Sequence, residues 1–430
     1  MGAPSRDPLE TVLLGALAER GLATSAELQR LSGKSQPTLS RALRSLSKQL
    51  VTLGRGKSTR YGLPQTIRGL PSQQPLWWTD VQGQITHFGT LSLLAGERVH
   101  VSADGIDELT RGKLPWFLSP LHLQGFLGRE WAQRLGLDRN PEQWDLEQLL
   151  YAVLRIDDHP GAISIGELKG EWVPEDPVDI GARGTRYDTL AADVSATLPA
   201  GSSAGGEQSK FLSALASGER VLVKFTPPRG TPFGDRWHDL LHAEWLALQV
   251  LGEHGFAIAA TQVLETAART YLESTRFDRI GANGRRHAVA LDAVHDAFVP
   301  GPRHHWASTC DALALQRRLS EADAATVRTL LEFGRLIGNT DMHFGNLSLW
   351  ADEPVRARFS LAPLYDMLPM RWRPDAFTGL HDYTTFEPQR PTRGAASIVL
   401  AQQFWRRLAG YSPVSEPLRR VAAQMALSRK

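Results

Sequence analysis

Three polar residues in the last third of the chain have the types and the spacing that phosphoryl transfer requires. Asp341 and Asn346 are five positions apart, and Asp366 follows Asn346 by twenty positions. Protein kinases use such a set: one Asp accepts the proton of the attacking hydroxyl, and the Asn and the second Asp bind the Mg²⁺ ions that bridge the ATP phosphates. The pattern therefore indicates a catalytic loop with Asp341 as base and with Asn346 and Asp366 as metal ligands.

A hairpin between Asn346 and Asp366 would bring these side chains together. Residues 346–350 and 358–361 have the composition of strands, and residues 351–354 can form the turn between them. Asp, Asn and His are also frequent in turns without any chemical role, so the spacing alone equally fits a capped loop. Features upstream in the chain favour the catalytic interpretation.

The middle of the chain has the order of features found in the small lobe of a kinase. A loop of small residues at 200–210 leads into two strands, and its glycines can bring backbone N–H groups against phosphates. Lys224 lies inside the apolar second strand, 220–225, where an ATP phosphate and a helix carboxylate together would explain its charge. Glu244, in the expected helix that follows, can supply that carboxylate.

Each of these features also has an interpretation without a nucleotide. Gly-Ser runs are often flexible connectors, Lys224 can point to solvent from an edge strand, and Glu244 can lie on a helix surface. The strand at residues 271–279 can be an ordinary strand that ends in Arg-Phe-Asp-Arg ion pairs, or a hinge whose backbone pairs with adenine. The residues of such a hinge would be Thr275, Arg276 and Phe277.

Residues 8–63 predict three helices followed by a hairpin, which is the order of a winged helix-turn-helix. Between residues 30 and 60 there are eight Lys or Arg residues and no Asp or Glu. Such a basic block is typical of a nucleic-acid-binding module whose third helix enters the major groove. A protein-interaction domain with a solvated basic face is the alternative. The residues expected to contact DNA are Ser35, which would also cap the third helix, Gln36, Ser40, Arg41 and Arg44, and at the wing Arg55, Lys57 and Arg60.

Length and composition bound the remaining classes. A chain of 430 residues suffices for two or three domains, and 42% hydrophobic with 22% charged residues is ordinary for a globular protein. Cys310 is the single cysteine, which excludes an intrachain disulfide and a cysteine zinc site and suits a reducing cytoplasm. No apolar run is long enough for a membrane span, and the start of the sequence lacks the apolar core of a signal peptide. We therefore expect a cytoplasmic protein, associated with the nucleoid where it binds DNA.

These patterns together predict an α+β protein in two parts. Residues 1–66 would form the winged helix-turn-helix, and the remainder would form a two-lobed, protein-kinase-like body. Residues 70–272 would make a β-rich small lobe with subdomains 70–195 and 196–272. Helical periodicity in residues 273–430 predicts a helical large lobe that carries the catalytic loop.

Six short motifs connect the chain to a known family. The most specific is Asn339-x-Asp341-x-His343-x-x-Asn346. The other five are Leu114-Pro115-Trp116-Phe117-Leu118, Gln124-Gly125-Phe126-Leu127-Gly128-Arg129, Ser203-Ala204-Gly205-Gly206-Glu207-Gln208, Arg276-Phe277-Asp278-Arg279 and Pro363-Leu364-Tyr365-Asp366. From about residue 70 onward the chain resembles the HipA family of bacterial Ser/Thr kinases, the toxin half of HipA–HipB systems. It looks most like the YjjJ-type members, which carry their own amino-terminal winged helix.

The resemblance implies roles for individual residues. Asp341 would be the catalytic Asp, with His343 beside it in the same motif. Asn346 and Asp366 would bind Mg²⁺, and Lys224 would contact the ATP phosphates. The glycine-rich loop would contribute Ser203, Gly205 and Gly206 to the nucleotide site. Ser202 or Ser203 stands where the family has a loop serine whose phosphorylation disables the enzyme. Ser209 departs from the Pro that many relatives have directly before the lysine that is Lys210 in this chain.

The sequence thus predicts an ATP- and Mg²⁺-dependent Ser/Thr protein kinase of the toxin type, fused to a DNA-binding winged helix. Its partners would be DNA, a protein substrate and, by the resemblance, a HipB-like antitoxin, although relatives usually encode the DNA-binding antitoxin separately. Winged helices often act as dimers, so a homodimer is expected. Two alternatives stay open: a DNA-binding regulator whose kinase-like body senses nucleotide without transfer, and a small-molecule phosphotransferase of the antibiotic type.

Overall fold

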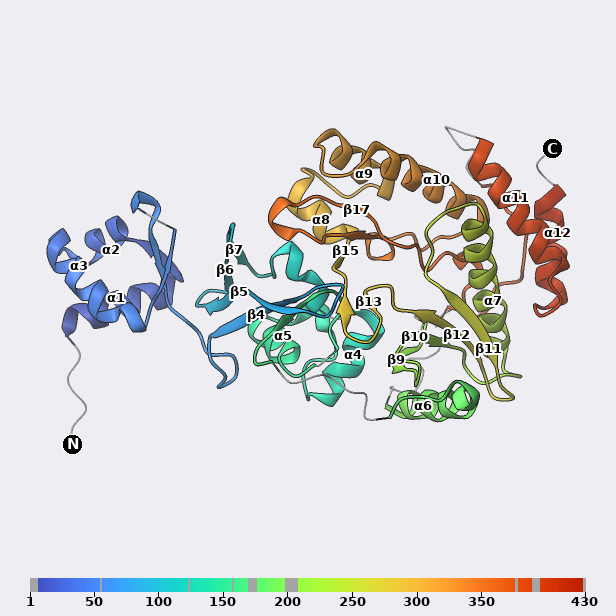
Figure 1. The fold of residues 1–430 in the computed structure, drawn as a ribbon, viewed down its shortest axis with the longest axis horizontal. Helices are drawn as coiled ribbons and strands as arrows, with labels where there is room; N and C mark the ends of the chain where they lie inside the picture. Colours follow the sequence, from blue (N-terminus) through green and yellow to red (C-terminus); the bar gives the residue numbers. More distant parts are fainter. Residues whose placement is uncertain are drawn as a thin grey trace.

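The computed structural model describes most of the chain. The described residues are 7–54, 56–122, 124–156, 158–168, 176–197, 208–375, 378–388 and 395–427. Figure 1 shows a small unit at the amino-terminal end, a second unit built on a sheet, and a larger body that contains a second sheet and most of the long helices. Among the helices in the described ranges, none is both long and apolar enough to cross a bilayer.

The amino-terminal unit contains three helices and a small antiparallel sheet of order β1-β3-β2. Thr24 and Glu27 form a capping box that starts the second helix. Ser35 occupies the N-cap position of the third helix, but its hydroxyl bonds to the Thr38 hydroxyl (3.0 Å) and caps no backbone N–H, so the predicted capping role was wrong. The elements are α1 (Pro8–Arg20), β1 (Leu22–Thr24), α2 (Ser25–Ser32), α3 (Gln36–Ser45), β2 (Val51–Leu53) and β3 (Arg60–Gly62).

The amino-terminal unit is joined to the next sheet by backbone hydrogen bonds. Gln65 N–H donates to the Leu93 carbonyl, and Ala95 N–H donates to the Leu63 carbonyl, both at 2.9 Å. Leu94 also packs with the buried side chains of β2. The segment that joins the two units is therefore fixed by hydrogen bonds and packing and is not a flexible linker.

The second unit is a five-stranded antiparallel sheet of order β7-β6-β5-β4-β8, and the apolar side chains of α5 pack in the same core as those of the sheet. The inward side chains of the sheet, such as Leu91, Val99 and Val101, are fully buried. The elements are β4 (Gln73–Thr79), β5 (Ile85–Leu94), β6 (Arg98–Ala103), β7 (Ile106–Arg111), the 3-10 segment η3 (Trp116–Leu121), α4 (Gly125–Arg134), α5 (Leu146–Val153) and β8 (Ile163–Ile165).

A four-stranded antiparallel sheet of order β11-β12-β10-β9 follows, with a long helix packed against it. Its apolar face carries Phe211, Val221, Val223 and Tyr271, all buried against α6. The elements are α6 (Arg183–Thr197), β9 (Lys210–Ala214), β10 (Arg220–Phe225), α7 (Pro232–Glu253), β11 (Thr261–Glu265) and β12 (Thr270–Thr275).

The last part is mainly helical, as helical periodicity predicted, with short strands that frame the candidate catalytic loop. β15, β16 and β17 form an antiparallel sheet, and α11 packs on α7, α10 and α12. The elements are β13 (Arg279–Ile280), β14 (Gly284–Arg285), β15 (Ala288–Ala290), α8 (Leu291–Phe298), α9 (Trp306–Leu315), α10 (Glu321–Ile337), the 3-10 turn η7 (Phe344–Asn346), β16 (Ser348–Trp350), β17 (Ser360–Leu361), α11 (Ala395–Gly410) and α12 (Glu416–Leu427).

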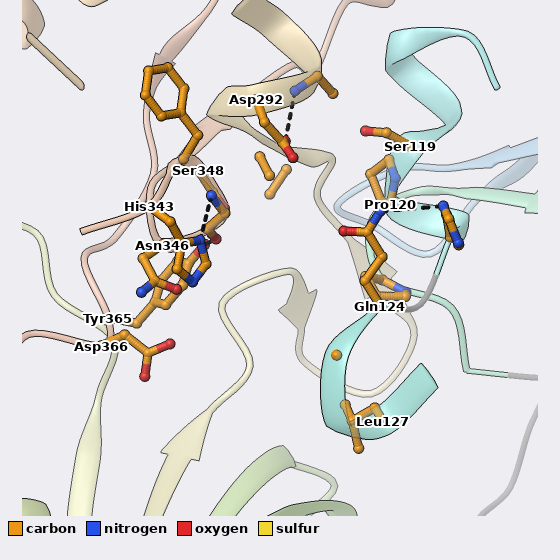
Figure 2. A pocket seen from close by; sticks show the side chains of 18 of the residues that line it. Ser119, Pro120, Gln124, Leu127, Asp292, His343, Asn346, Ser348, Tyr365 and Asp366 are labelled. Atoms are coloured by element: carbon orange, nitrogen blue, oxygen red, sulfur yellow. Dashed lines mark hydrogen bonds between the residues drawn. The ribbon is translucent and has the colours of Figure 1, made fainter. Parts of the chain in front are cut away.

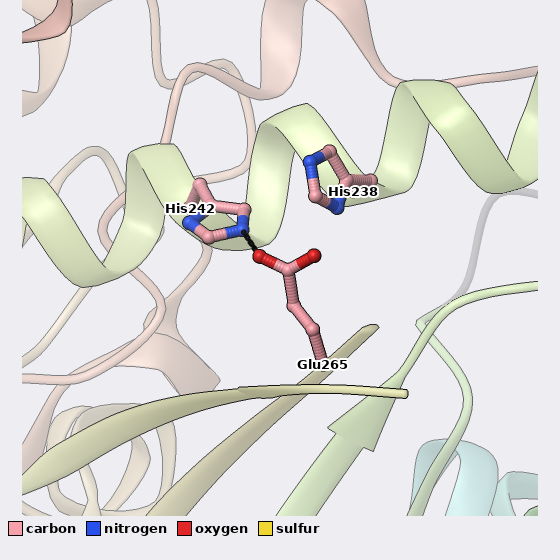
Figure 3. Close-up of side chains that lie close together, drawn as sticks. All are labelled: His238, His242 and Glu265. Carbon is pink, nitrogen blue, oxygen red and sulfur yellow. Dashed lines mark hydrogen bonds and ion pairs between the residues drawn. The ribbon is translucent and has the colours of Figure 1, made fainter. Parts of the chain in front are cut away.

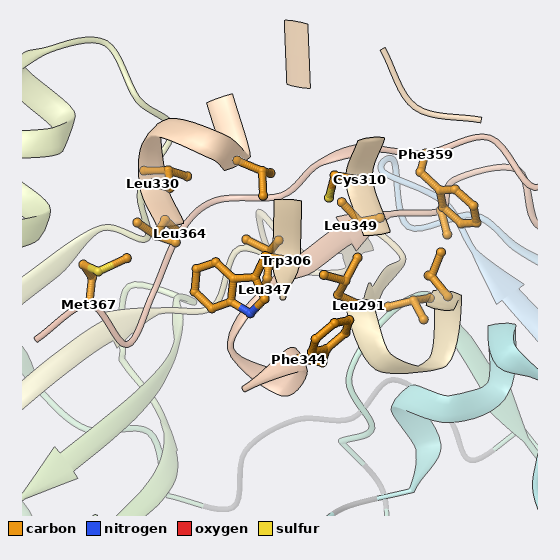
Figure 4. Packing of buried hydrophobic residues seen from close by; sticks show 14 of the residues in the cluster. Leu291, Trp306, Cys310, Leu330, Phe344, Leu347, Leu349, Phe359, Leu364 and Met367 are labelled. Atoms are coloured by element: carbon orange, nitrogen blue, oxygen red, sulfur yellow. The ribbon is translucent and has the colours of Figure 1, made fainter. Parts of the chain in front are cut away.

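One large apolar core supports this part of the molecule. Trp306 is fully buried at its centre, between Leu330 of α10 and the two leucines Leu347 and Leu349 (Figure 4). Its indole N–H reaches out of the core and donates to the carbonyl of His343 at 2.9 Å. The core therefore fixes the position of the candidate catalytic loop directly, since a buried indole needs that acceptor.

Candidate active site

A cleft of about 1390 Å³ lies between the second unit, the four-stranded sheet and the helical part. Figure 2 shows His343, Asn346 and Asp366 on one wall and Gln124 on the opposite wall, where η3 leads into α4. The cleft is lined by the residues that the sequence predicted to act on a substrate or a metal, which are Asp341, His343, Asn346 and Asp366. Lys224 lines it as well. The structure thus brings together side chains from four separate stretches of the chain.

Asn339 ties the two Asp-bearing segments to each other. Its Oδ1 accepts the backbone N–H of Asp341 at 3.0 Å, and its Nδ2 donates to the backbone carbonyl of Asp366 at 3.2 Å. Gly338 ends α10 in the left-handed conformation, with φ of 80°, so the chain turns sharply toward the cleft. A Cβ at Gly338 would lie 2.8 Å from the ring of Phe386, which also favours glycine there.

The loop itself is held by short-range hydrogen bonds. Asn346 Nδ2 donates to the Asp341 carbonyl at 2.8 Å, so its amide oxygen is the atom left to bind a ligand. His343 Nδ1 accepts the backbone N–H of Gly345 at 3.1 Å and starts the turn η7. Asn346 and His343 therefore both shape the loop, whatever else they contact.

The predicted hairpin between Asn346 and Asp366 is confirmed. β16 and β17 pair antiparallel, with Leu349 opposite Leu361. Beyond the hairpin, the Tyr365 hydroxyl donates to the Gly345 carbonyl at 2.8 Å and lies 2.7 Å from the Ser348 hydroxyl. These bonds return the Tyr-Asp segment to the catalytic loop, which explains how a separation of twenty residues becomes a single site.

Asp366 has an unusual backbone conformation, with φ of 54°. This left-handed region is uncommon for residues other than glycine and costs of order 1 kcal/mol, although Asp tolerates it better than most. The hydrogen bonds of the Asn339 amide and the Tyr365 hydroxyl hold the segment there. The residue with the strained backbone is thus also the candidate metal ligand. Strained backbone conformations are common at functional sites.

Lys224 connects the two sides of the cleft. Its ammonium group lies 2.6 and 2.8 Å from the two carboxylate oxygens of Glu244 on α7, and it also contacts Asp366 Oδ1. Burial opposes the charge of Lys224, but Asp366 and Glu244 outweigh it and raise the pKa of the ammonium group above its usual value. The lysine is therefore a buried, fully charged group with two carboxylate partners.

The two carboxylates respond differently to this environment. Burial raises the pKa of Glu244 although Lys224 acts in the opposite direction. For Asp366, burial also opposes ionisation, but Lys224 and Lys210 prevail and hold the pKa of the carboxyl below its usual value. Asp366 is thus the more strongly ionised of the two, which suits a ligand of a divalent cation.

Lys210 is a cleft residue that the sequence patterns did not single out. It lies directly opposite Lys224 in the pairing of β9 with β10, so both side chains emerge on the same face of the sheet. Burial, with the positive charges of Lys224 and Arg129, lowers the pKa of Lys210. The available signal was the hairpin register: counting back from the turn at residues 215–219 places residue 210 beside residue 224.

The expected hinge residues line the cleft, but two of them are already engaged. The N–H groups of Thr275 and Arg276 donate to the carbonyls of Ala260 and Arg220, at 2.9 and 2.8 Å. A nucleotide would therefore have to use other atoms of this segment.

The side chain of Arg276 forms the ion pairs that the alternative interpretation of this segment expected. Its guanidinium group lies 2.5 Å from Asp158 and 2.9 Å from Asp278. The ring of Phe277 stacks on Tyr365, with 5.9 Å between the centroids. The glycine-rich loop residues Ser202, Ser203, Gly205 and Gly206 lie outside the described residues.

The described residues among those expected to contact DNA lie on or beside α3 and in the hairpin. Leu39, Ala42 and Leu43 face the core of the unit, while Arg41 and Arg44 are exposed on the opposite face. In Figure 1, α3 lies at the end of the molecule farthest from the cleft-bearing body. Of the others, Ser35, Gln36 and Arg60 are exposed, Ser40 is half-buried, the side chain of Lys57 is not described, and Arg55 lies outside the described residues.

Comparison with known proteins places this architecture in a family. Residues 202–426 match the family described as HipA-like C-terminal domain, and residues 70–171 match the family described as YjjJ-like toxin, middle domain. The chain is 36% identical over 428 residues to Toxin YjjJ of Escherichia coli strain K12, with 94% of each protein covered. The chain belongs to the HipA family, as a YjjJ-like member. The sequence-based assignment to this family is confirmed.

Solved structures agree with a HipA fold. HipA of Shewanella oneidensis, solved with HipB and its operator DNA, superposes with a TM-score of 0.52 at 16% identity, covering 82% of this chain and 95% of that one. The Helicobacter pylori proinflammatory kinase CtkA is more remote, with a TM-score of 0.33 at 13% identity over 52% of this chain and 87% of that one. This HipA-family chain therefore has a mixed helix and sheet fold similar to that of HipA.

Proposed function

We propose that this HipA-family protein is an ATP- and Mg²⁺-dependent Ser/Thr protein kinase. The observation that carries the proposal is the position of Lys224, which joins Glu244 of α7 to Asp366 inside a cleft that also contains the Asp341–Asn346 loop. A lysine, a helix carboxylate, a base and two oxygen ligands are the parts that kinases require. The phosphorylated partner would be a protein, as expected for a toxin-type kinase.

The donor atoms of the loop suit Mg²⁺. Asn346 presents an amide oxygen, because its Nδ2 is bound to Asp341, and Asp366 presents an ionised carboxylate. Hard oxygen ligands of this kind are those that Mg²⁺ prefers, and it binds few protein groups because it also binds phosphate oxygens. When bound, the ion would neutralise charge on the phosphates.

The chain's own side chains would do the remaining work. The carboxylate of Asp341 would orient the acceptor hydroxyl and take its proton. Lys224 and Lys210 would present positive charge to the phosphates from adjacent strands. Asn339 would hold Asp341 and Asp366 at a fixed separation.

The direct test is transfer of labelled phosphate from ATP to proteins of a bacterial extract, with wild type and Asp341→Ala measured in parallel. We expect Asp341→Ala to abolish transfer and to leave nucleotide binding nearly unchanged, because Asp341 does not contact Lys224 or Asp366 through any described bond. Loss of ATP binding with unimpaired transfer would contradict these roles. Binding without transfer in the wild type would favour a nucleotide-sensing regulator, and transfer to small molecules alone would favour a phosphotransferase.

We also propose that the amino-terminal unit is a DNA-binding winged helix. The supporting observation is the exposed row of Arg41 and Arg44 on α3, opposite the buried face of that helix. α3 would enter a major groove, and Arg60 would contact the backbone from the hairpin. Its partners would be DNA, a HipB-like antitoxin and a second copy of the chain in a homodimer. Phosphorylation of Ser202 or Ser203 would regulate the kinase.

A further inference from the structure

A second cluster of potential ligands lies outside the cleft. His238 and His242 are four positions apart on α7, and Glu265 at the end of β11 faces them (Figure 3). One ligand atom from each of the three lies within 4.8 Å of the other two. Both histidines are buried, with exposed fractions of 8% and 2%, and none of the three residues lines the cleft.

The spacing of the atoms suits a shared metal ion. Two histidines separated by four positions project from the same face of a helix, the arrangement that helical zinc sites use. His242 Nε2 is 3.1 Å from Glu265 Oε1. Ligands bound tetrahedrally to one zinc ion at about 2.1 Å are separated by about 3.4 Å, so this pair requires only a small shift.

The partners of the two imidazoles form an outer shell. His238 Nδ1 lies 2.7 Å from the Thr270 hydroxyl, and His242 Nδ1 lies 3.2 Å from the Tyr411 hydroxyl. With protons on Nδ1, both rings would donate to these oxygens and keep a lone pair on Nε2, which in His242 faces Glu265 Oε1 and in His238 faces the Pro413 carbonyl. Metal-binding histidines are commonly oriented in this way.

Two further groups complete the site. Arg229 lies 2.7 Å from Glu265 Oε2 and so fixes the carboxylate with Oε1 directed at the histidines. The carbonyl oxygen of Pro413 lies 2.9 Å from His238 Nε2 and is near enough to serve as a fourth ligand. Without an ion, the other tautomer of His238 would donate Nε2–H to this carbonyl, so the two states differ by the position of one proton on the ring.

We propose that His238, His242 and Glu265 form a structural Zn²⁺ site. Two imidazoles with one carboxylate suit zinc better than Mg²⁺ or Ca²⁺, which prefer oxygen ligands. The ion would join α7 to β11 and to the segment between α11 and α12 that carries Tyr411 and Pro413. Because α7 also carries Glu244, the site would stiffen the helix that holds Lys224 in place.

The test uses the full chain, stripped of metal and free of nucleotide. Zn²⁺ would be titrated in competition with a chromophoric chelator, and Co²⁺ would report the ligand geometry by its visible absorption. We expect one Zn²⁺ per wild-type chain. His242→Gln and Glu265→Gln should each lower the affinity for Zn²⁺ at least about tenfold. Tyr411→Phe, which keeps all ligands, should lower it about tenfold.

Two control variants separate this site from other places where zinc binds. His254→Gln removes an exposed histidine of the end of α7, and Asp366→Asn removes a cleft carboxylate; both should keep the high-affinity ion. Thermal unfolding checks the fold, because Zn²⁺ should raise the Tm of the wild type but not that of His242→Gln or Glu265→Gln. Zinc affinity that is equal in the wild type and in both ligand variants, with no shift of Tm, overturns the proposal independently of any kinase activity.

Discussion

At the scale of single residues, the buried ammonium group of Lys224 depends on its two carboxylate partners. Removing one member of a buried ion pair leaves an uncompensated charge, and this costs about 3 to 5 kcal/mol. Glu244 has an exposed fraction of 1%, so little water reaches its carboxylate while the lysine is present. The stability of this contact and its chemical role can therefore be separated by mutation.

We predict that Lys224→Met both destabilises the protein and lowers phosphate transfer by roughly 100-fold, because an aligned positive charge is lost. The double variant Lys224→Met with Glu244→Gln should recover much of the Tm, since no unpaired charge then remains buried, but it should not recover transfer. Thermal unfolding and the labelled-ATP assay measure the two effects. Transfer that returns with the Tm would show that the lysine is only structural.

A buried histidine gives the second prediction at this scale. His287 donates from Nε2 to the Phe117 carbonyl at 2.8 Å, and its Nδ1 accepts the Ala162 N–H at 3.2 Å, so only the neutral ring satisfies both contacts. Burial lowers the pKa of His287 to about 4. The unfolded chain therefore binds a proton more readily, and stability that is present above about pH 6.5 is lost as the pH falls toward 4, by up to about 3 kcal/mol.

The measurement is thermal unfolding between pH 7 and pH 4. His287→Gln should be less stable than wild type at pH 7 but should lose less stability on acidification. His304→Gln, which alters an exposed histidine, should show the same dependence of Tm on pH as the wild type. If His287→Gln shows the same dependence of Tm on pH as the wild type, His287 is not the group whose protonation destabilises the fold.

The sequence predicted the acidic and amide members of the site because their spacing along the chain has a chemical meaning. Asp341, Asn346 and Asp366 do converge, and Glu244 does meet Lys224. Asn339 was noticed only as part of a motif, because its role as a bridge depends on two backbone groups that approach only in the folded chain. Lys210 was missed for a similar reason: its importance follows from the register between two strands.

At the scale of elements, α3 was predictable because its apolar and basic residues separate onto two faces. The exposed arginines Arg41 and Arg44 flank a stripe that includes the buried Leu43. The cap was not predictable, because Ser35 has a second partner one turn away in Thr38. Residue types and spacing do not reveal which of two possible partners a side-chain hydroxyl will bond.

We predict that Arg41→Gln and Arg44→Gln each weaken DNA binding and reduce the dependence of log affinity on log salt by about one unit, as expected when one phosphate contact is lost. Arg20→Gln, on the last turn of α1, is the matched control and should change neither quantity. Binding should be measured at several salt concentrations. Slopes equal to that of the wild type in both α3 variants would argue for a protein-interaction surface.

At the scale of the whole molecule, the amino-terminal unit is part of one continuous structure with the sheet that follows. The hydrogen bonds of Gln65 and Ala95 and the packing of Leu94 join the two. The sequence could not show this, since the Pro and Gly residues of the segment 64–75 predict a linker. A rigid joint would fix the direction of α3 relative to the cleft.

Gly21 lies at this joint with φ of 76°, and a Cβ there would stand 2.5 Å from the Ala95 carbonyl oxygen and overlap the Arg98 guanidinium. We predict that Gly21→Val loosens the joint and exposes residues 64–72 to proteolysis. Gly15→Ala, inside α1 with no atom within 4 Å of the new Cβ, should instead stabilise the unit by up to about 1 kcal/mol. Equal protease resistance in the wild type and Gly21→Val would show that the joint does not depend on this contact.

The measurement that tests the proposed kinase site most directly is a crystal structure of the full chain with Mg²⁺ and a non-hydrolysable ATP analogue. We predict that an oxygen of Asp366 and the amide oxygen of Asn346 both lie within about 2.1 Å of bound Mg²⁺. Lys224 should then contact phosphate oxygens while it keeps its bond to Glu244, and Asp341 should face the terminal phosphate without binding it. Nucleotide bound outside this cleft, or a metal ion that contacts neither Asp366 nor Asn346, would contradict the proposed kinase site.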